Sequence, residues 1–167
     1  VVLVTAASGL AEPVMVNVVP VGSAQEMCDA VLEHVKSADA LIMAAAVADY
    51  RPSSQAEEKI KKSEDDLSIA LTKTTDILQA ARGSFVRVGF SAESQDLVKN
   101  AKAKVQSKEL DLIVANDITD PDSGFGRDTN KVALIGRNLQ VEELPVLTKY
   151  EVSNRILDRV LVLLPVN

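Results

Sequence analysis

The amino-acid sequence predicts an α/β fold built on a doubly wound, mostly parallel sheet with an antiparallel β excursion. Apolar strand-like runs alternate with segments whose apolar residues recur at helical spacing, a pattern typical of α/β proteins. Aromatic residues make up only 3% of the chain and Trp is absent, so Val, Leu, Ile and Ala must form the core. These residues suit parallel strands that are covered by helices. At 167 residues, we expect a single domain.

The first part of the chain predicts two strands, a helix and a third strand. Residues 1–5 and 16–21 are β-rich and a loop separates them. Ser23 and Glu26 have the spacing of a capping box, in which two side chains satisfy free amides at a helix start. The following helix places four apolar residues at helical spacing: Met27, Val31, Leu32 and Val35. The apolar run 40–46 then predicts a strand buried on both faces.

The middle of the chain begins with a polar segment. Residues 53–66 are charge-dense, and we expect a mobile surface segment there. Residues 67–73 predict a strand, after which Thr74 or Thr75 should cap a short helix. The run 85–90 predicts a buried strand.

The last part predicts a helix, a strand, a hairpin and a final helix. The first helix, at about 94–108, places Leu97, Ala101 and Val105 on one face. A buried strand is expected at 110–115, a loop at 120–126 and a hairpin over 131–144. Thr148 and Glu151 form a second capping box for a helix that runs to about residue 164.

Composition excludes several classes of function. The net charge of −6 argues against a protein that binds the phosphate backbone of nucleic acids, which requires clustered Lys and Arg. One cysteine, Cys28, excludes an internal disulfide and a cysteine-based zinc site, and the single His34 excludes histidine metal sites. We expect no membrane span and, by default, a cytoplasmic location.

Three buried strands end in polar residues. Asp49, Glu93 and the pair Asn116–Asp117 each follow an apolar run. The carboxyl ends of parallel strands meet at one edge of a sheet, where open α/β proteins bind ligands. The alternative is that Asp and Asn start turns or cap helices, and for Glu93 we favour that alternative.

Two groups of lysines could face the same edge. The first lies in the polar segment and contains Lys59, Lys61 and Lys62, whereas Lys104 and Lys108 are four residues apart on one helical face. Lysines near carboxylates suit a polyphosphate–metal site. Solvated surface charge is the alternative, and for any single lysine it is favoured. The chain has no GxGxxG, GxxxxGK[ST] or GxSxG motif.

A more specific signal is a set of motifs in a fixed order: AAAVADYRP, EKIKK, TDIL, VGFSAES, KELDLIVANDI and GFGRDTNKVALI. Together they closely resemble the phosphopantothenoylcysteine synthetase family over roughly residues 23–157. The resemblance implies a Rossmann-like, dimeric ligase that joins 4′-phosphopantothenate to cysteine. In bacterial members, CTP activates the carboxylate as an acyl-cytidylate, Mg²⁺ accompanies the triphosphate, and a flavin-dependent decarboxylase is often fused to the domain.

The resemblance also implies roles for individual residues. Ala45, Ala46 and Val47 would contact the substrate through their backbone, with Asn116 shaping the pocket, and Asp49 would contact the nucleotide or its metal ion. Lys59 would close over the site and stabilise charge at the reacting phosphate. The nucleotide site would comprise Ala44, Ala45, Asp49, Lys59, Thr75, Asp76, Ile77, Leu78, Phe90, Lys104 and Lys108. Residues 125–130 would lie near the dimer interface.

The chain departs from the family pattern in two places, and these departures leave more than one function open. Thr74–Thr75 stands where family members usually carry Asn–Pro, and the family's first strand with its Gly-Gly-Thr turn has no counterpart, since VVLVTAASGL resembles the second strand. We therefore expect a ligase domain that is incomplete at its N-terminus. The alternative is a non-catalytic nucleotide-binding or dimerisation fragment. An NAD(P)-dependent oxidoreductase ranks lower because the glycine fingerprint is missing.

Overall fold

The fold is centred on a five-stranded mixed sheet. The computed structural model describes residues 1–6, 9, 11–62, 66–119 and 126–165. The strand order is β10-β9-β7-β6-β3, with bounds β3 (Ala40–Met43), β6 (Val86–Glu93), β7 (Leu112–Asp117), β9 (Val132–Gly136) and β10 (Val141–Glu143). Strands β3, β6 and β7 are parallel, whereas β9 and β10 form an antiparallel hairpin. The predicted α/β class, mostly parallel with an antiparallel excursion, is confirmed.

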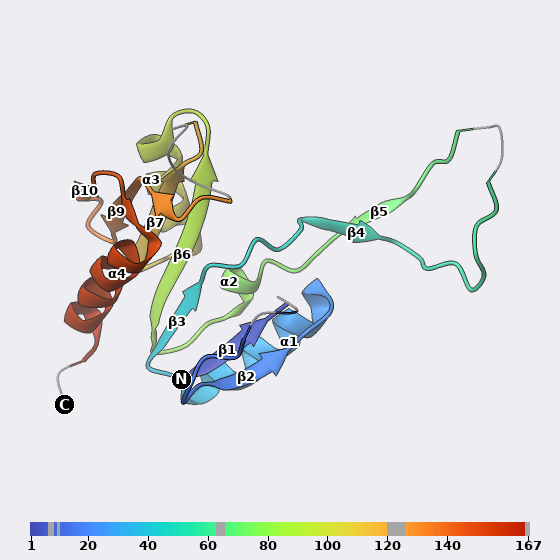
Figure 1. Ribbon diagram of the computed structural model, residues 1–167, viewed down its shortest axis with the longest axis horizontal. Coiled ribbons are helices and arrows are strands. Elements are labelled where there is room, and N and C mark those ends of the chain that lie inside the picture. Colours follow the sequence, from blue (N-terminus) through green and yellow to red (C-terminus); the bar gives the residue numbers. More distant parts are fainter. Residues whose placement is uncertain (7–8, 10, 63–65, 120–125, 166–167) are drawn as a thin grey trace.

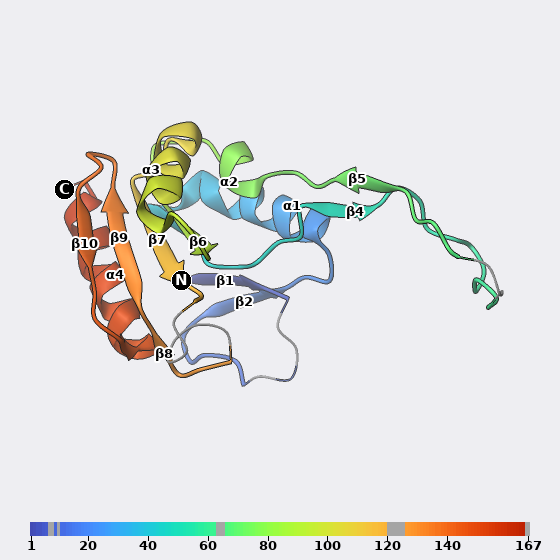
Figure 2. The same cartoon turned by 90° about the horizontal axis from the view of Figure 1, so that it is seen from above.

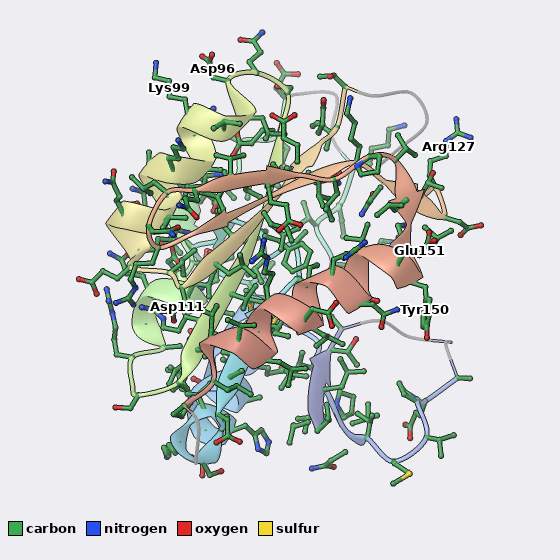
Figure 3. All side chains as sticks on the ribbon, turned by 90° about the vertical axis from the view of Figure 1, so that its left-hand side faces the viewer. Asp96, Lys99, Asp111, Arg127, Tyr150 and Glu151 are labelled. Carbon is green, nitrogen blue, oxygen red and sulfur yellow. The ribbon has the colours of Figure 1, made fainter. Side chains whose placement is uncertain are left out.

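Helices cover both faces of this sheet (Figure 1). Helix α4 (Lys149–Leu163) packs Val152, Ile156 and Val160 onto one face, and α3 (Leu97–Lys108) packs Ala101 and Val105 onto the other. The predicted capping box starts α4, because Thr148 accepts from the Glu151 amide at 3.2 Å and its own amide donates to the Glu151 carboxylate at 2.9 Å. Glu151 is labelled at this helix start in Figure 3.

The N-terminal segment forms a smaller unit beside the main sheet. Strands β1 (Val2–Thr5) and β2 (Asn17–Pro20) form a separate parallel pair, followed by α1 (Ala24–His34) and a single 3₁₀ turn, η1 (Val35–Ser37). Helix α1 packs against α2 (Ile77–Ala80) through a small apolar core. The first capping box is only half formed: Ser23 accepts from the Glu26 amide, but the Glu26 carboxylate accepts from Gly22 at 2.7 Å instead of Ser23.

A long arm projects from the body of the molecule (Figures 1 and 2). Strands β4 (Tyr50–Pro52) and β5 (Leu71–Lys73) form its antiparallel base, and the polar segment lies beyond them. The strand that the sequence predicts over 67–73 is therefore only three residues long. Short strands β8 (Thr129–Asn130) and β11 (Leu147–Thr148) pair near the start of α4.

Three sequence predictions are corrected. The run 40–46 is a strand only to Met43 and is not buried on both faces, because β3 is an edge strand whose Ile42 is 40% exposed. Asp76, rather than Thr74 or Thr75, caps α2. Strand β6 continues past Phe90 to Glu93. Most of the loop expected at 120–126 lies outside the described residues.

Within the described ranges, every helix is too short or too polar to cross a membrane.

Candidate nucleotide-binding edge

The carboxyl ends of β3, β6 and β7 lie at one edge of the sheet, as predicted. Residues 44–49 leave β3 at this edge, and Thr74 joins them to the start of α2. The Thr74 hydroxyl donates to the Ala48 carbonyl at 2.5 Å, and its amide donates to the Asp49 carbonyl at 2.9 Å. The structure therefore brings the Ala44–Asp49 segment together with the Thr75–Leu78 turn, both of which the resemblance assigns to the nucleotide.

Asp76 and Lys108 meet beside this turn. One carboxylate oxygen of Asp76 accepts from the Gln79 amide and starts α2, and the other is 2.7 Å from the Lys108 Nζ. Burial by itself raises the pKa of Asp76, but hydrogen bonds from Lys108 and from the Gln79 and Leu78 amides lower it below the usual value. Asp76 is therefore an ionised group that holds both a helix start and a cation.

Glu93 and Lys104 form a second ion pair on the same face of the sheet. The Lys104 Nζ is 2.6 Å from the Glu93 Oε1, and the Asn100 side-chain amide donates to the other oxygen at 3.2 Å. The Glu93 side chain is only 11% exposed. Burial raises its pKa, but the hydrogen bonds from Lys104 and Asn100 and the charge of Lys104 lower it below the usual value. Glu93 therefore stands at the end of β6 as the buried partner of Lys104.

A pH-dependent contribution to stability follows from this pair. Because the pKa of Glu93 is lowered in the folded protein from about 4.5, its stabilisation is complete above that value and is lost as the pH falls through the folded pKa. We expect Glu93→Gln to make the acid-induced fall in the urea midpoint shallower between about pH 6 and pH 3. Parallel curves for variant and wild type would contradict this account.

Two further predicted site residues, Phe90 and Asn116, lie on the other face of the sheet. Because side chains alternate along a strand, Phe90 and Asn116 point to the side of α4, where Phe90 packs against the apolar core. The Asn116 Oδ1 is buried and has no hydrogen-bond partner among the described residues. The two lysine–carboxylate ion pairs, Lys104–Glu93 and Lys108–Asp76, therefore lie on the α3 side of the sheet. Phe90 and Asn116 lie on the α4 side.

The predicted lysine of the arm is not brought to this edge. Lys59 is exposed and belongs to the segment beyond β4 and β5, which extends away from α3 in both views (Figures 1 and 2). The exposed apolar residues of the arm include Leu67, Ile69 and Leu71, each about 60% exposed. Within one copy of the chain, the arm and the lysine pairs are separate.

Two cavities, of about 380 and 410 Å³, lie at the opposite edge of the sheet. Figure 3 shows that edge at Asp111, far from Asp96 and Lys99 at the start of α3. Both cavities include Arg137, which pairs with Asp111 at 3.0 Å. We place the candidate site by the carboxyl ends of the strands, where open α/β proteins bind ligands, and not by cavity size.

A bound Mg²⁺ ion would need ligands from the substrate as well as from the protein. Among the described residues, no group of three or more His, Cys, Asp or Glu side chains could hold a metal ion. Asp49 is exposed, and the Asp76 and Glu93 carboxylates already hold lysines. One carboxylate fits Mg²⁺ when phosphate oxygens supply further ligands, which is the usual arrangement in phosphoryl-transfer sites.

The fold is that of an open α/β protein with a Rossmann-like sheet. Residues 1–163 match the family model described as the DNA/pantothenate metabolism flavoprotein C-terminal domain, and the chain belongs to this family. The bifunctional coenzyme A biosynthesis protein CoaBC of Bacillus subtilis (strain 168) is 37% identical over 164 residues, covering 96% of this chain and 40% of that protein.

Solved structures agree with this assignment. The C-terminal domain of a CoaBC protein is 34% identical with a TM-score of 0.77, and the match covers 95% of this chain and 71% of that one. A Cab2 mutant in complex with phosphopantothenate-cysteine shares the fold, at 15% identity and a TM-score of 0.64, over 86% of this chain and 53% of that one. The chain spans well under half of the curated relative it matches.

Proposed function

We propose that this domain joins 4′-phosphopantothenate to L-cysteine in coenzyme A biosynthesis, with CTP as the activating nucleotide. The observation that carries the proposal is a pair of lysines on one face of α3 in a domain of this family. Lys108 pairs with Asp76 of the Thr75–Leu78 turn, and Lys104 pairs with Glu93 at the end of β6. The structural relative Cab2 is described with phosphopantothenate-cysteine bound, which is the product that this reaction forms.

The reaction would run in two steps. A carboxylate oxygen of 4′-phosphopantothenate attacks the α-phosphorus of CTP, and the bond to the β-phosphate breaks to release pyrophosphate. The cysteine amine then attacks the acyl carbon of the acyl-cytidylate, loses a proton, and CMP leaves. Both steps move negative charge among phosphates, so positioned cations lower the barrier.

The chain's residues divide this work between binding and charge stabilisation. Lys104 and Lys108 would bind the triphosphate, and Lys59 would stabilise the charge at the reacting phosphate. Backbone groups of Ala44–Val47 would contact the nucleotide and the substrate, with Phe90 and Asn116 on the far side of the strand ends. Asp49, together with phosphate oxygens, would hold Mg²⁺, which would supply additional charge neutralisation.

A direct test supplies 4′-phosphopantothenate, CTP, Mg²⁺ and cysteine and measures CMP and pyrophosphate. We expect one of each per ligated product. The assay should compare this chain with a version extended at its N-terminus by the family's first strand and Gly-Gly-Thr turn. In the described structure β1 and β3 each have an edge without a strand partner, where such a strand would pair. Tight CTP binding without turnover in either protein would favour the alternative, a non-catalytic binding module.

We also propose that the domain acts as a homodimer through its arm. Leu67, Ile69 and Leu71 are spaced by two residues and so lie on one side of extended chain, yet each is exposed. A monomer leaves this apolar row in water, whereas a second copy would bury it. The flavin-dependent decarboxylase that the family resemblance implies is a further proposed partner, in keeping with the bifunctional relative CoaBC.

The proposed dimer interface on the arm can be tested by introducing one charged residue into the apolar row. Ile69→Asp should shift the molecular mass measured by light scattering from dimer to monomer, because burying an unpaired carboxylate is costly. Ser68→Asp is the matched control on the other side of the arm, and it should remain dimeric. A dimeric Ile69→Asp variant would show that the interface lies elsewhere.

A further inference from the structure

Neighbouring elements hold the short helix α2 in place, and what we infer from this rests on the proposed function. Helix α2 has only four residues, which is too short to be stable by itself. It nevertheless contributes Asp76 and Leu78 to the proposed nucleotide site, and Asp76 holds Lys108. Its position must therefore be set by neighbouring elements.

Arg87 on β6 contacts the ends of two helices. Its side chain is buried, with the residue 5% exposed. One guanidinium nitrogen donates to the Leu78 carbonyl in α2, and the other donates to the Glu109 carbonyl at the end of α3, at 3.2 Å. Carbonyls at helix ends carry partial negative charge and lack partners within the helix. Arg87 thus joins α2, β6 and α3 through the carbonyls that most need a cation.

Two residues further along β6, the absence of a side chain at Gly89 lets Leu78 of the same helix pack closely against the strand. A Cβ at this position would lie 3.0 Å from the Leu78 Cδ1 and 2.9 Å from the Leu110 Cδ1, closer than normal van der Waals contact. Alternate residues of one strand therefore fix both the backbone and the side chain of Leu78. This precision exceeds what a surface turn needs.

We propose that Arg87 is a positioning residue for the nucleotide site, holding α2 against β6 and α3 so that Asp76 and Lys108 meet at the triphosphate. Arg87 itself lies at the far end of α2 and would not touch the nucleotide. Its removal should release the turn, because the Leu78 and Glu109 carbonyls would lose their guanidinium donor. The main sheet should stay formed, because its strands are joined by their own backbone ladders.

The experiment measures amide hydrogen exchange of the ligand-free protein, with Arg87→Met as the variant. The Gln79, Ala80 and Ala81 amides, which donate to Asp76 and Ile77, should exchange at least about tenfold faster. The CTP–Mg²⁺ dissociation constant should rise by about tenfold, and Arg87→Lys should recover part of both effects. Arg159→Met, which removes an exposed pairing between Arg159 on α4 and Glu142 on β10, is the control for loss of an arginine elsewhere and should change neither.

Two outcomes would overturn the proposal. One is unchanged exchange of the α2 amides in both Arg87 variants. The other is faster exchange spread evenly over β7 and α3, which would show a general structural role. Should the wild type fail to bind CTP, the proposed function fails, while the exchange data still decide whether Arg87 positions α2.

Discussion

Replacing Lys59 with glutamine is expected to reduce formation of the acyl-cytidylate by about 10²–10³-fold, the usual cost of losing one group that stabilises transition-state charge. Glutamine keeps an unbranched stem with a polar end, although it is one atom shorter, and it removes the charge. Lys59 lies exposed on the arm, so the fold and the unfolding midpoint should not change. The measurement is the rate of pyrophosphate release with 4′-phosphopantothenate and CTP, before cysteine is added.

Lys62→Gln is the matched control for this experiment. It removes a charge from the same exposed segment, where Glu57 and Glu58 provide nearby negative charge. We expect wild-type rates for Lys62→Gln. Equal rates for both variants and the wild type would assign Lys59 to the solvated surface of the arm.

Removing the charge of Lys108 should weaken CTP binding by about 10–100-fold, which corresponds to the loss of one or two charge-assisted hydrogen bonds to phosphate. Lys108 is positioned for this role by Asp76, whose carboxylate lies 2.7 Å from the lysine nitrogen. The test is calorimetric titration of CTP–Mg²⁺ into Lys108→Gln, in parallel with CMP. The loss should be larger for CTP, because CMP lacks the β- and γ-phosphates.

Lys99→Gln serves as the control on the same helix. Figure 3 shows Lys99 at the start of α3, pointing away from the sheet. Its replacement should leave CTP affinity unchanged. An equal loss of affinity in both variants would indicate that the general charge of the helix, and not the Asp76–Lys108 pair, attracts the nucleotide.

Much of the fold follows from local sequence patterns. Apolar runs such as that of β7 and helical spacing such as Val152, Ile156 and Val160 identify elements, since burial on a sheet or a helix face imposes those periods. The burial of β3 could not be predicted in the same way. An apolar run looks alike in a central and an edge strand, because strand order is set by long-range pairing.

The placement of the candidate site residues was predictable within a single segment, and less so where two segments meet. The lysines of α3 were identified by their spacing, but Glu93 lies eleven residues from Lys104, and no spacing rule relates a strand end to a helix face. The sequence led us to expect Thr74 or Thr75 as the cap of α2, but Asp76 caps it. Thr74 instead bonds the Ala48 carbonyl, and Asp76 also pairs with Lys108. For Arg87, the one sequence feature that could have indicated a special role is its charge within the otherwise apolar run FVRVGF.

The central claim is that this domain activates a carboxylate through CTP at the β3–β6–β7 edge. The most direct test uses 4′-phosphopantothenate whose carboxylate carries ¹⁸O, with CTP, Mg²⁺ and cysteine. An acyl-cytidylate intermediate transfers one carboxylate oxygen to the nucleotide, so mass spectrometry should find one ¹⁸O atom in the phosphate of each CMP formed. CMP released without ¹⁸O, or no CMP from either this chain or its N-terminally extended version, would contradict the account.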